Sequence, residues 1–281
     1  MLRFLKLNHI KWVFMVTLPA LLLVLGSPVV SQGDFALRIS PPNFEFKVKP
    51  GQIIRDTIAL ENTDVNRGTY DVRTADWELN ENGGVVIFPA DQSLPSTSCR
   101  PWTRIERNTL SLAPNRTKRY RFEVNVPHDA PDGECRFAIV IGPSADTAAT
   151  MNMGSLNVPV VGSIAVVVYV TVGEATPDLS LKEVKRLNTG EGAAIAMRLR
   201  NSGTAHARPF GSLKVKDAKG KSAELLIVPF PVLPGEARDI RLAVDSRFSG
   251  IESMEALTFP ISLKGLVEWD GGKMKIDTVV E

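Results

Sequence analysis

The sequence has almost no net charge and is neither polar nor repetitive enough to be disordered. Of its 281 residues, 33 are Lys or Arg and 31 are Asp or Glu, which gives a formal net charge of +2 at pH 7. Nucleic-acid binding usually needs a clustered basic excess, so this balance argues against a nucleic-acid partner. Hydrophobic residues make up 44% and charged residues 23%, the usual composition of a globular protein.

Residues and motifs of catalytic or metal chemistry are also scarce. Only two histidines, His128 and His206, follow the first 31 residues, and neither has a second His or a carboxylate at zinc-ligand spacing. The chain has no G-x-S-x-G nucleophile motif and no phosphate-binding loop. Both histidines lie in polar or proline-rich connections, so we interpret them as exposed loop residues. The sequence therefore predicts a protein that is not an enzyme and uses no metal or cofactor.

The first 31 residues have the layout of a secretory signal peptide. Three basic residues come first: Arg3, Lys6 and Lys11. The apolar run 12–26 follows, and small residues up to Ser31 then offer a cleavage site. We predict cleavage after Ser31 and export to the periplasm. The alternative is an uncleaved membrane anchor, because the segment 12–30 is just long enough to cross a bilayer, although Pro19 argues against a continuous helix.

Two cysteines, Cys99 and Cys135, remain after the signal segment. In an oxidising compartment an even number of cysteines predicts a disulfide. Such a bond would close a loop of about 36 residues and add roughly 3–4 kcal/mol of stability in the chain-entropy model. Cys135 alternates in step with Phe137, Ile139 and Ile141, which places all four on the inward face of one strand.

The hydrophobic pattern has the period of a strand and not that of a helix. Between 119 and 126, for example, apolar and polar residues alternate strictly. Turn signals separate about seven or eight short strands between 35 and 172. After a linker at Glu174–Pro177, about seven more strands follow. The pattern predicts an all-β protein of two immunoglobulin-like antiparallel sandwiches, residues 32–175 and 176–281.

The segment 158–172 does not alternate, because it is apolar on both faces from Ile164 to Val170. Two interpretations are open. The strand is packed on both sides, for instance at the junction of the two domains, or it is an apolar edge kept for the strand of a partner. The candidate partner-binding residues are Ile164, Val166, Val168 and Val170. The preceding segment, Ser144–Leu156, is predicted to be a mobile loop that leads into this strand in hairpin fashion.

The layout resembles the periplasmic pilus-assembly chaperones (PapD-like), in which a signal peptide precedes two immunoglobulin-like domains. A long loop and a strongly apolar strand that end the first domain are part of the resemblance. The matching segments are Ile39-Ser-Pro-Pro42, Phe44-x-Phe46, Pro50-Gly51, Ile58–Asn62, Tyr70–Val72 and Leu110–Pro114. The resemblance covers most of the chain after the signal segment and consists of pattern, with no single specific motif.

The resemblance implies that the last strand of the first domain lends alternate apolar side chains to an incomplete exported subunit, pilin-like or of another surface protein. In that family two basic residues in the interdomain cleft also hold the terminal carboxylate of the subunit. This chain has Asn43 and Ala165 at those places, and Arg38 is the nearest substitute for the first. Strand pairing is therefore the part of the mechanism that we expect here. The alternative is a structural or adhesive cell-envelope protein whose two sandwiches serve as docking modules.

Overall fold

The computed structural model confirms an all-β fold. It describes residues 36–89, 92, 95–144, 149–153, 156–160, 162–190, 192–247 and 251–281. This part contains strands and two short 3-10 helices, Arg100–Trp102 and Met254–Ala256, but no α-helix. Residues Gly33–Glu281 form one compact unit. The predicted signal segment, residues 1–31, lies outside the described residues.

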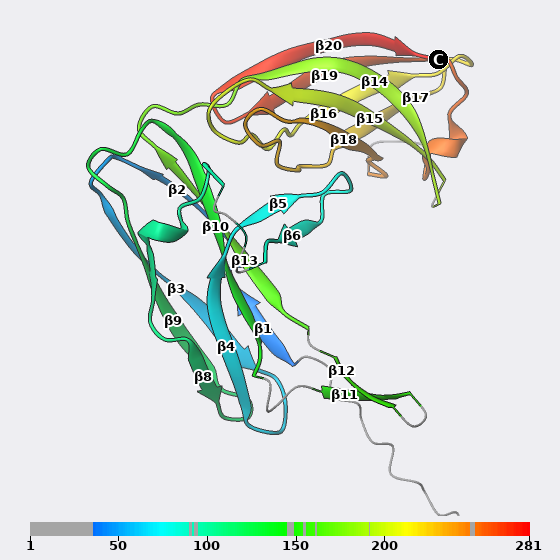
Figure 1. Ribbon diagram of the computed structural model, residues 1–281. Helices are drawn as coiled ribbons and strands as arrows, with labels where there is room; N and C mark the ends of the chain where they lie inside the picture. Colours follow the sequence, from blue (N-terminus) through cyan, green and yellow to red (C-terminus); the bar gives the residue numbers. More distant parts are fainter. Residues whose placement is uncertain are drawn as a thin grey trace, which may run out of the picture. The chain divides into compact units, whose positions relative to one another are not determined.

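Two sheets form the first sandwich (Figure 1). The four-stranded sheet has the order β1 (Leu37–Ser40), β3 (Ile53–Asn62), β9 (Thr117–Asn125), β7 (Thr103–Ile105). The five-stranded sheet has the order β2 (Asn43–Val48), β13 (Ile164–Val172), β10 (Gly133–Pro143), β4 (Gly68–Ala75), β8 (Thr109–Leu112). Two separate hairpins are β5 (Trp77–Leu79) with β6 (Val85–Ile87), and β11 (Ala149–Met153) with β12 (Leu156–Val160).

The chain changes sheets between β1 and β2. β1 pairs with β3 in the four-stranded sheet, and β2 pairs with β13 in the five-stranded sheet. Pro41 and Pro42 separate the two strands, and a proline has no N–H to continue a ladder. The pairing of β2 with β13 is parallel, whereas the other strand pairs of the described chain are antiparallel. The predicted antiparallel sandwiches are thus confirmed, with this one parallel pair at the end of the five-stranded sheet.

The inward side chains of both sheets meet in one core, as the alternating pattern predicts. Tyr120 and Val124 of β9 are completely buried, as are Phe137 and Ile139 of β10. The predicted disulfide between Cys99 and Cys135 is present, with the two Cα atoms 5.4 Å apart. Both half-cystines belong to this core, so the disulfide ties the segment before β7 to the middle of the five-stranded sheet.

The second sandwich consists of seven strands, the number expected from the sequence. Their order is β14 (Leu179–Thr189), β15 (Gly192–Asn201), β18 (Ala237–Val244), β17 (Ser222–Ile227), β16 (Ser212–Lys216), β19 (Ile261–Trp269), β20 (Gly272–Val280). Leu179 of β14 and Ile276 of β20 lie at opposite ends of that order but belong to the same buried core. The sheet therefore folds over on itself around this core. A domain boundary at 175/176 stays a prediction.

The connection 173–178 is hydrogen-bonded at both ends. Gly173 donates its N–H to the carbonyl of Val48 at 2.9 Å. Thr176 accepts the N–H of Thr204 at 2.8 Å, and Asp178 donates its N–H to Oδ1 of Asn201 at 3.1 Å. The predicted linker is thus attached to β2 on one side and to the turn after β15 on the other.

A third apolar cluster lies on the outward face of the five-stranded sheet. It includes Trp77, Val140 and Tyr169 from the first sandwich and Leu233 from the second. Arg238 reinforces it by donating hydrogen bonds to the carbonyls of residues 79 and 80 in the β5–β6 hairpin, at 3.4 and 2.8 Å. Residues of both sandwiches are therefore buried together at this face.

Candidate functional site

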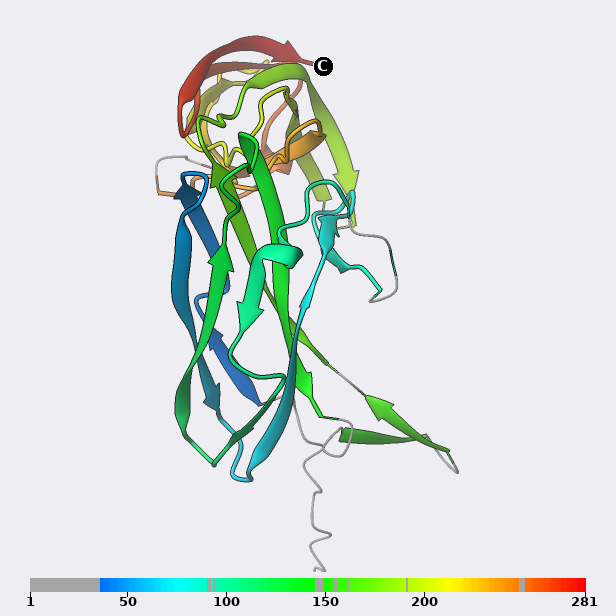
Figure 2. The same cartoon turned by 60° about the vertical axis from the view of Figure 1, so that its left-hand side comes forward.

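The apolar strand β13 is paired along its whole length on one side and along only part of it on the other. β10 pairs with it from Ile164 to Val172. β2 pairs with it only from Val167, opposite Asn43, onward (Figures 1 and 2). Within the described residues, Ile164–Val166 has no strand on that second side. We refer to this three-residue stretch as the open edge.

The backbone directions show which groups face the open edge. The N–H and carbonyl of Arg136 bond to residues 97 and 99, so the backbone polar groups of the even-numbered residues of β10 are directed away from β13. These groups alternate in direction along a strand, so the N–H and carbonyl of Ile139 face those of its partner Val166. The backbone polar groups of the odd-numbered residues of β13 are then directed toward β2, as the N–H of Gly173 is. Ala165 accordingly presents its N–H and carbonyl to the open edge.

The predicted partner-binding side chains are buried in the protein's own core, apart from the first. Val166, Val168 and Val170 are fully buried in the core of the first sandwich, and Ile164 is half-buried. The interpretation of a strand packed on both sides describes the part from Val167 onward, and the use of the strand by a partner stays a prediction. From Val167 onward β13 has a neighbour on both sides, and before that residue its edge is open.

The segment before β13 is more regular than expected. Part of the predicted mobile loop 144–156 is strand, because β11 pairs with β12 from Ala149↔Val160 to Met153↔Leu156. Pro159 of β12 lies opposite Thr150 of β11, and a proline has no N–H to donate to a neighbouring strand.

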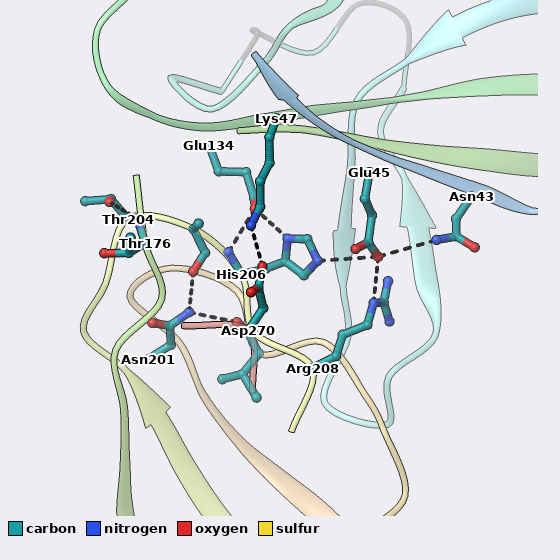
Figure 3. A network of polar contacts seen from close by, with 12 residues as sticks. Asn43, Glu45, Lys47, Glu134, Thr176, Asn201, Thr204, His206, Arg208 and Asp270 are labelled. Carbon is teal, nitrogen blue, oxygen red and sulfur yellow. Dashed lines mark hydrogen bonds and ion pairs between the residues drawn. The ribbon is translucent and has the colours of Figure 1, made fainter. Parts of the chain in front are cut away.

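The outward side chains of β2 contact residues of the second sandwich (Figure 3). Glu45 accepts a hydrogen bond from Nε of Arg208 at 2.7 Å and one from Asn43 at 3.4 Å. Nε2 of His206 lies 3.5 Å from the same Glu45 oxygen. Lys47 forms an ion pair with Asp270 in the β19–β20 turn. Two charged side chains of β2 are thus held by residues of the second sandwich.

His206 lies at the centre of this network, and the interpretation of it as an exposed loop residue is wrong. Its side chain is only 8% exposed, its Nδ1 lies 2.5 Å from Oε2 of Glu134, and its ring stacks on Tyr169 at 4.2 Å. Burial lowers the pKa of His206, but hydrogen bonds to Glu134 and Glu45 outweigh it and raise the pKa to about 9. No local pattern signals this role, because all of its partners are distant in the sequence. His128 is exposed, as expected.

Glu45 is the complementary group of the network. The hydrogen bond from His206, with help from Arg208, outweighs the effect of burial and lowers the pKa of Glu45 to about 2. At neutral pH the carboxylate is therefore charged and faces two cations. Such an arrangement holds strands together and offers no free acid or base for catalysis.

The two predicted cleft residues lie in different sheets. Arg38 belongs to β1 and pairs with Glu61 of β3 at 2.9 Å, with its side chain 69% exposed. Asn43 begins β2 and bonds to Glu45. The structure therefore does not bring Arg38 to the open edge, and neither Asn43 nor Ala165 is a cation.

The described residues contain no group of three or more His, Cys, Asp or Glu side chains that could hold a metal ion. In the same part of the chain, none of the helices has the length and apolar character needed to cross a membrane.

No protein-family model and no curated protein matches the sequence. Among solved structures, the YadV chaperone matches 87% of this chain and 99% of its own, at 11% identity and a TM-score of 0.44. The E. coli chaperone DraB matches 88% and 97%, at 14% identity and a TM-score of 0.43. The SafB chaperone of Salmonella enterica, in complex with the SafA pilin, gives the same coverage and identity, with a TM-score of 0.42. The structures similar to this chain thus include fimbrial chaperones, the family that its sequence pattern resembles.

Proposed function

We propose that this chain is a non-enzymatic chaperone of an exported subunit, pilin-like or of another surface protein, and that it binds the subunit by strand pairing at the open edge. The observation that carries the proposal is the partial cover of β13: β10 pairs with all of it, and β2 pairs with it only from Val167 onward. An apolar strand with unpaired backbone groups is a template for another strand.

The surroundings of the open edge suit a strand that is apolar on both faces. On one face, Val166 and Phe44 belong to the buried core of the first sandwich. On the other face, Ala165 and Val167 pack against the third apolar cluster. A strand placed beside Ala165, in line with β2, would add apolar side chains to both. The partner segment that fits here is therefore an extended segment of a subunit that cannot bury these apolar side chains within its own fold.

Strand pairing carries the binding in this proposal, and a terminal carboxylate does not. Asn43 and Ala165 at the open edge are neutral, and the nearby cations His206 and Arg208 are engaged by carboxylates. A free carboxylate placed here would meet no unpaired cation among these residues. The partner segment is therefore held by backbone hydrogen bonds and apolar contact.

The experiment uses proline substitutions at two strand edges. Ala165→Pro removes the N–H that faces the open edge and leaves the donors to β10 in place. Val279→Pro is the matched control, because Val279 is 59% exposed on the end strand β20, at a position whose N–H points away from β19. Each tagged variant is expressed in its native host, crosslinked in the exported compartment and purified, and bound proteins are identified by mass spectrometry.

We expect exported surface subunits to co-purify with the unaltered protein and with Val279→Pro, and at least tenfold less with Ala165→Pro. Equal recovery with Ala165→Pro would overturn the proposal, and so would the absence of such subunits from the unaltered protein. Circular dichroism of the purified variants shows whether each one is folded.

The proposal includes export and cleavage of the first 31 residues, which bring the chain to its partner. Mass spectrometry of the protein recovered from the periplasm should give an amino terminus at Gln32. An intact Met1 in a membrane fraction would instead support the anchored form.

The alternative is a structural or adhesive envelope protein that uses the sandwiches as docking modules. The observation in its favour is that β13 is covered on both sides from Val167 to Val172. In that case Ala165→Pro would leave every interaction unchanged.

A further inference from the structure

β2 is the strand that determines where the open edge ends, and it lies at the end of the five-stranded sheet. Its inward residues Phe44 and Val48 are buried in the core of the first sandwich. Its outward residues Glu45 and Lys47 are held by the second sandwich, through His206 and Arg208 in one case and Asp270 in the other (Figure 3). Opposite faces of one short strand are therefore fixed by different parts of the chain.

Release of β2 would lengthen the open edge. The odd-numbered residues of β13 from Val167 to Thr171 point their backbone groups toward β2, by the same alternation that directs Ala165 outward. Without β2 these groups would be available to another strand. The stretch that could pair would then grow from Ile164–Val166 to Ile164–Val172, which includes Val168 and Val170.

We propose that the second sandwich acts as a clamp that keeps β2 on β13 and thereby sets the length of the edge that a partner strand can use. The clamp itself is a property of the chain alone, whereas its effect on a partner rests on the proposed function. A partner strand that replaced β2 would have to break the contacts of Glu45 and Lys47 with the second sandwich.

The contacts of Glu45 with the second sandwich form a network in which several charged groups share partners. His206 is faced by Glu134 from β10, Glu45 from β2 and the ring of Tyr169 from β13, with Arg208 beside it in its own loop. Loss of the Glu45 charge would replace the shared anionic acceptor of His206 and Arg208 by a weaker neutral one. The Lys47–Asp270 pair is more exposed, with side chains 75% and 79% accessible, so its contribution is the smaller one.

The alternation along β13 provides an internal test by amide hydrogen exchange. The N–H groups of Tyr169 and Thr171 point toward β2, and those of Val168 and Val170 point toward β10. The variant that weakens the clamp combines Glu45→Gln with Asp270→Asn. Exchange is measured residue by residue by NMR on the full mature chain, without a partner. The matched control is Arg38→Gln, which breaks the Arg38–Glu61 pair between β1 and β3.

We expect the amides of Tyr169 and Thr171 to exchange at least tenfold faster in the clamp variant, while those of Val168 and Val170 keep their rates. Arg38→Gln should change none of the four. Unchanged rates at Tyr169 and Thr171 would overturn the clamp, and so would an equal acceleration of all four, which would indicate general destabilisation. Arg208→Gln, which removes the other cation held by Glu45 and leaves the His206–Glu134 pair in place, is the second variant and should give the same alternation.

The outcome for the clamp is separate from the outcome for the proposed function. Alternating exchange together with full subunit capture by Ala165→Pro would leave the clamp standing and remove the chaperone role. Loss of capture by Ala165→Pro together with unchanged exchange would support the chaperone role and remove the clamp.

Discussion

Nδ1 of His206 lies 2.5 Å from Oε2 of Glu134, a carboxylate whose side chain is completely buried. The backbone N–H of His206 donates to the same oxygen at 2.8 Å. One residue of the second sandwich thus contacts the same oxygen of a buried acid of the first sandwich twice. Because a buried carboxylate without a partner is costly, this pair ties the stability of the fold to the charge on His206.

The first prediction concerns pH. His206 has a pKa of about 9 in the folded chain and a reference value of 6.5, so protonation favours the folded state. Its stabilising contribution is complete below about pH 6.5 and is lost as pH rises through 9. The full contribution is roughly 3 kcal/mol. Urea unfolding of the mature protein should therefore show stability falling between about pH 6.5 and 9.5. The same series with His206→Asn should be nearly flat, and equal slopes would contradict the prediction.

The sequence predicted which segments form strands, but it did not predict which strand pairs with which. Alternation at Tyr120 and Cys135 placed both residues inward, because it reflects the two faces of a single strand. Which strand lies beside β13 depends instead on contacts between distant segments. The parallel pairing of Asn43 with Val167 has no local signature. The burial of His206 likewise depends on Glu134, 72 residues away in the sequence.

The apolar run 158–172 shows the same limit. Its lack of alternation left two interpretations open, burial on both sides or an edge kept for a partner. From Val166 to Val170 the structure has one face in the core and the other against the third apolar cluster. The pattern describes side chains only. Whether the backbone edge is open depends on where β2 begins, and that point is set by Pro41 and Pro42 further back in the chain.

The second prediction concerns the connection between the sandwiches. A Cβ atom at Gly203 would lie 2.3 Å from the carbonyl oxygen of Thr176 and 2.5 Å from the nitrogen of Asp178. Both are backbone atoms, so the linker itself would have to move. We expect Gly203→Ala to lower the free energy of unfolding by about 1–3 kcal/mol. Gly190→Ala is the control, since no atom lies within 4 Å of a Cβ there. Equal unfolding midpoints in urea would show that the linker contact contributes nothing.

The third prediction concerns the disulfide. Cys99 and Cys135 are 36 residues apart in the sequence and both are buried. Replacing both with Ser should lower the free energy of unfolding by roughly 3–4 kcal/mol, because the unfolded chain regains the entropy of an open loop. Guanidinium unfolding of the two proteins under non-reducing conditions measures the difference. Addition of a reductant should then destabilise the unaltered protein and leave the double variant unchanged; a response of the double variant would argue against the disulfide as the source.

The fourth prediction separates burial from partner binding at β13. Val168 is fully buried between β10 and β2, whereas Val65 in the turn before β4 is 79% exposed. A lysine at 168 would place a charge inside the hydrophobic core of the first sandwich. We expect Val168→Lys to cost at least about 4 kcal/mol of stability and Val65→Lys less than about 0.5 kcal/mol. Thermal unfolding followed by circular dichroism would distinguish them.

A stable Val168→Lys protein would mean that β13 can leave the core, and partner capture by that variant would then report on binding. If it unfolds, lost capture reports only on the fold, and Ala165→Pro is the variant that tests the open edge.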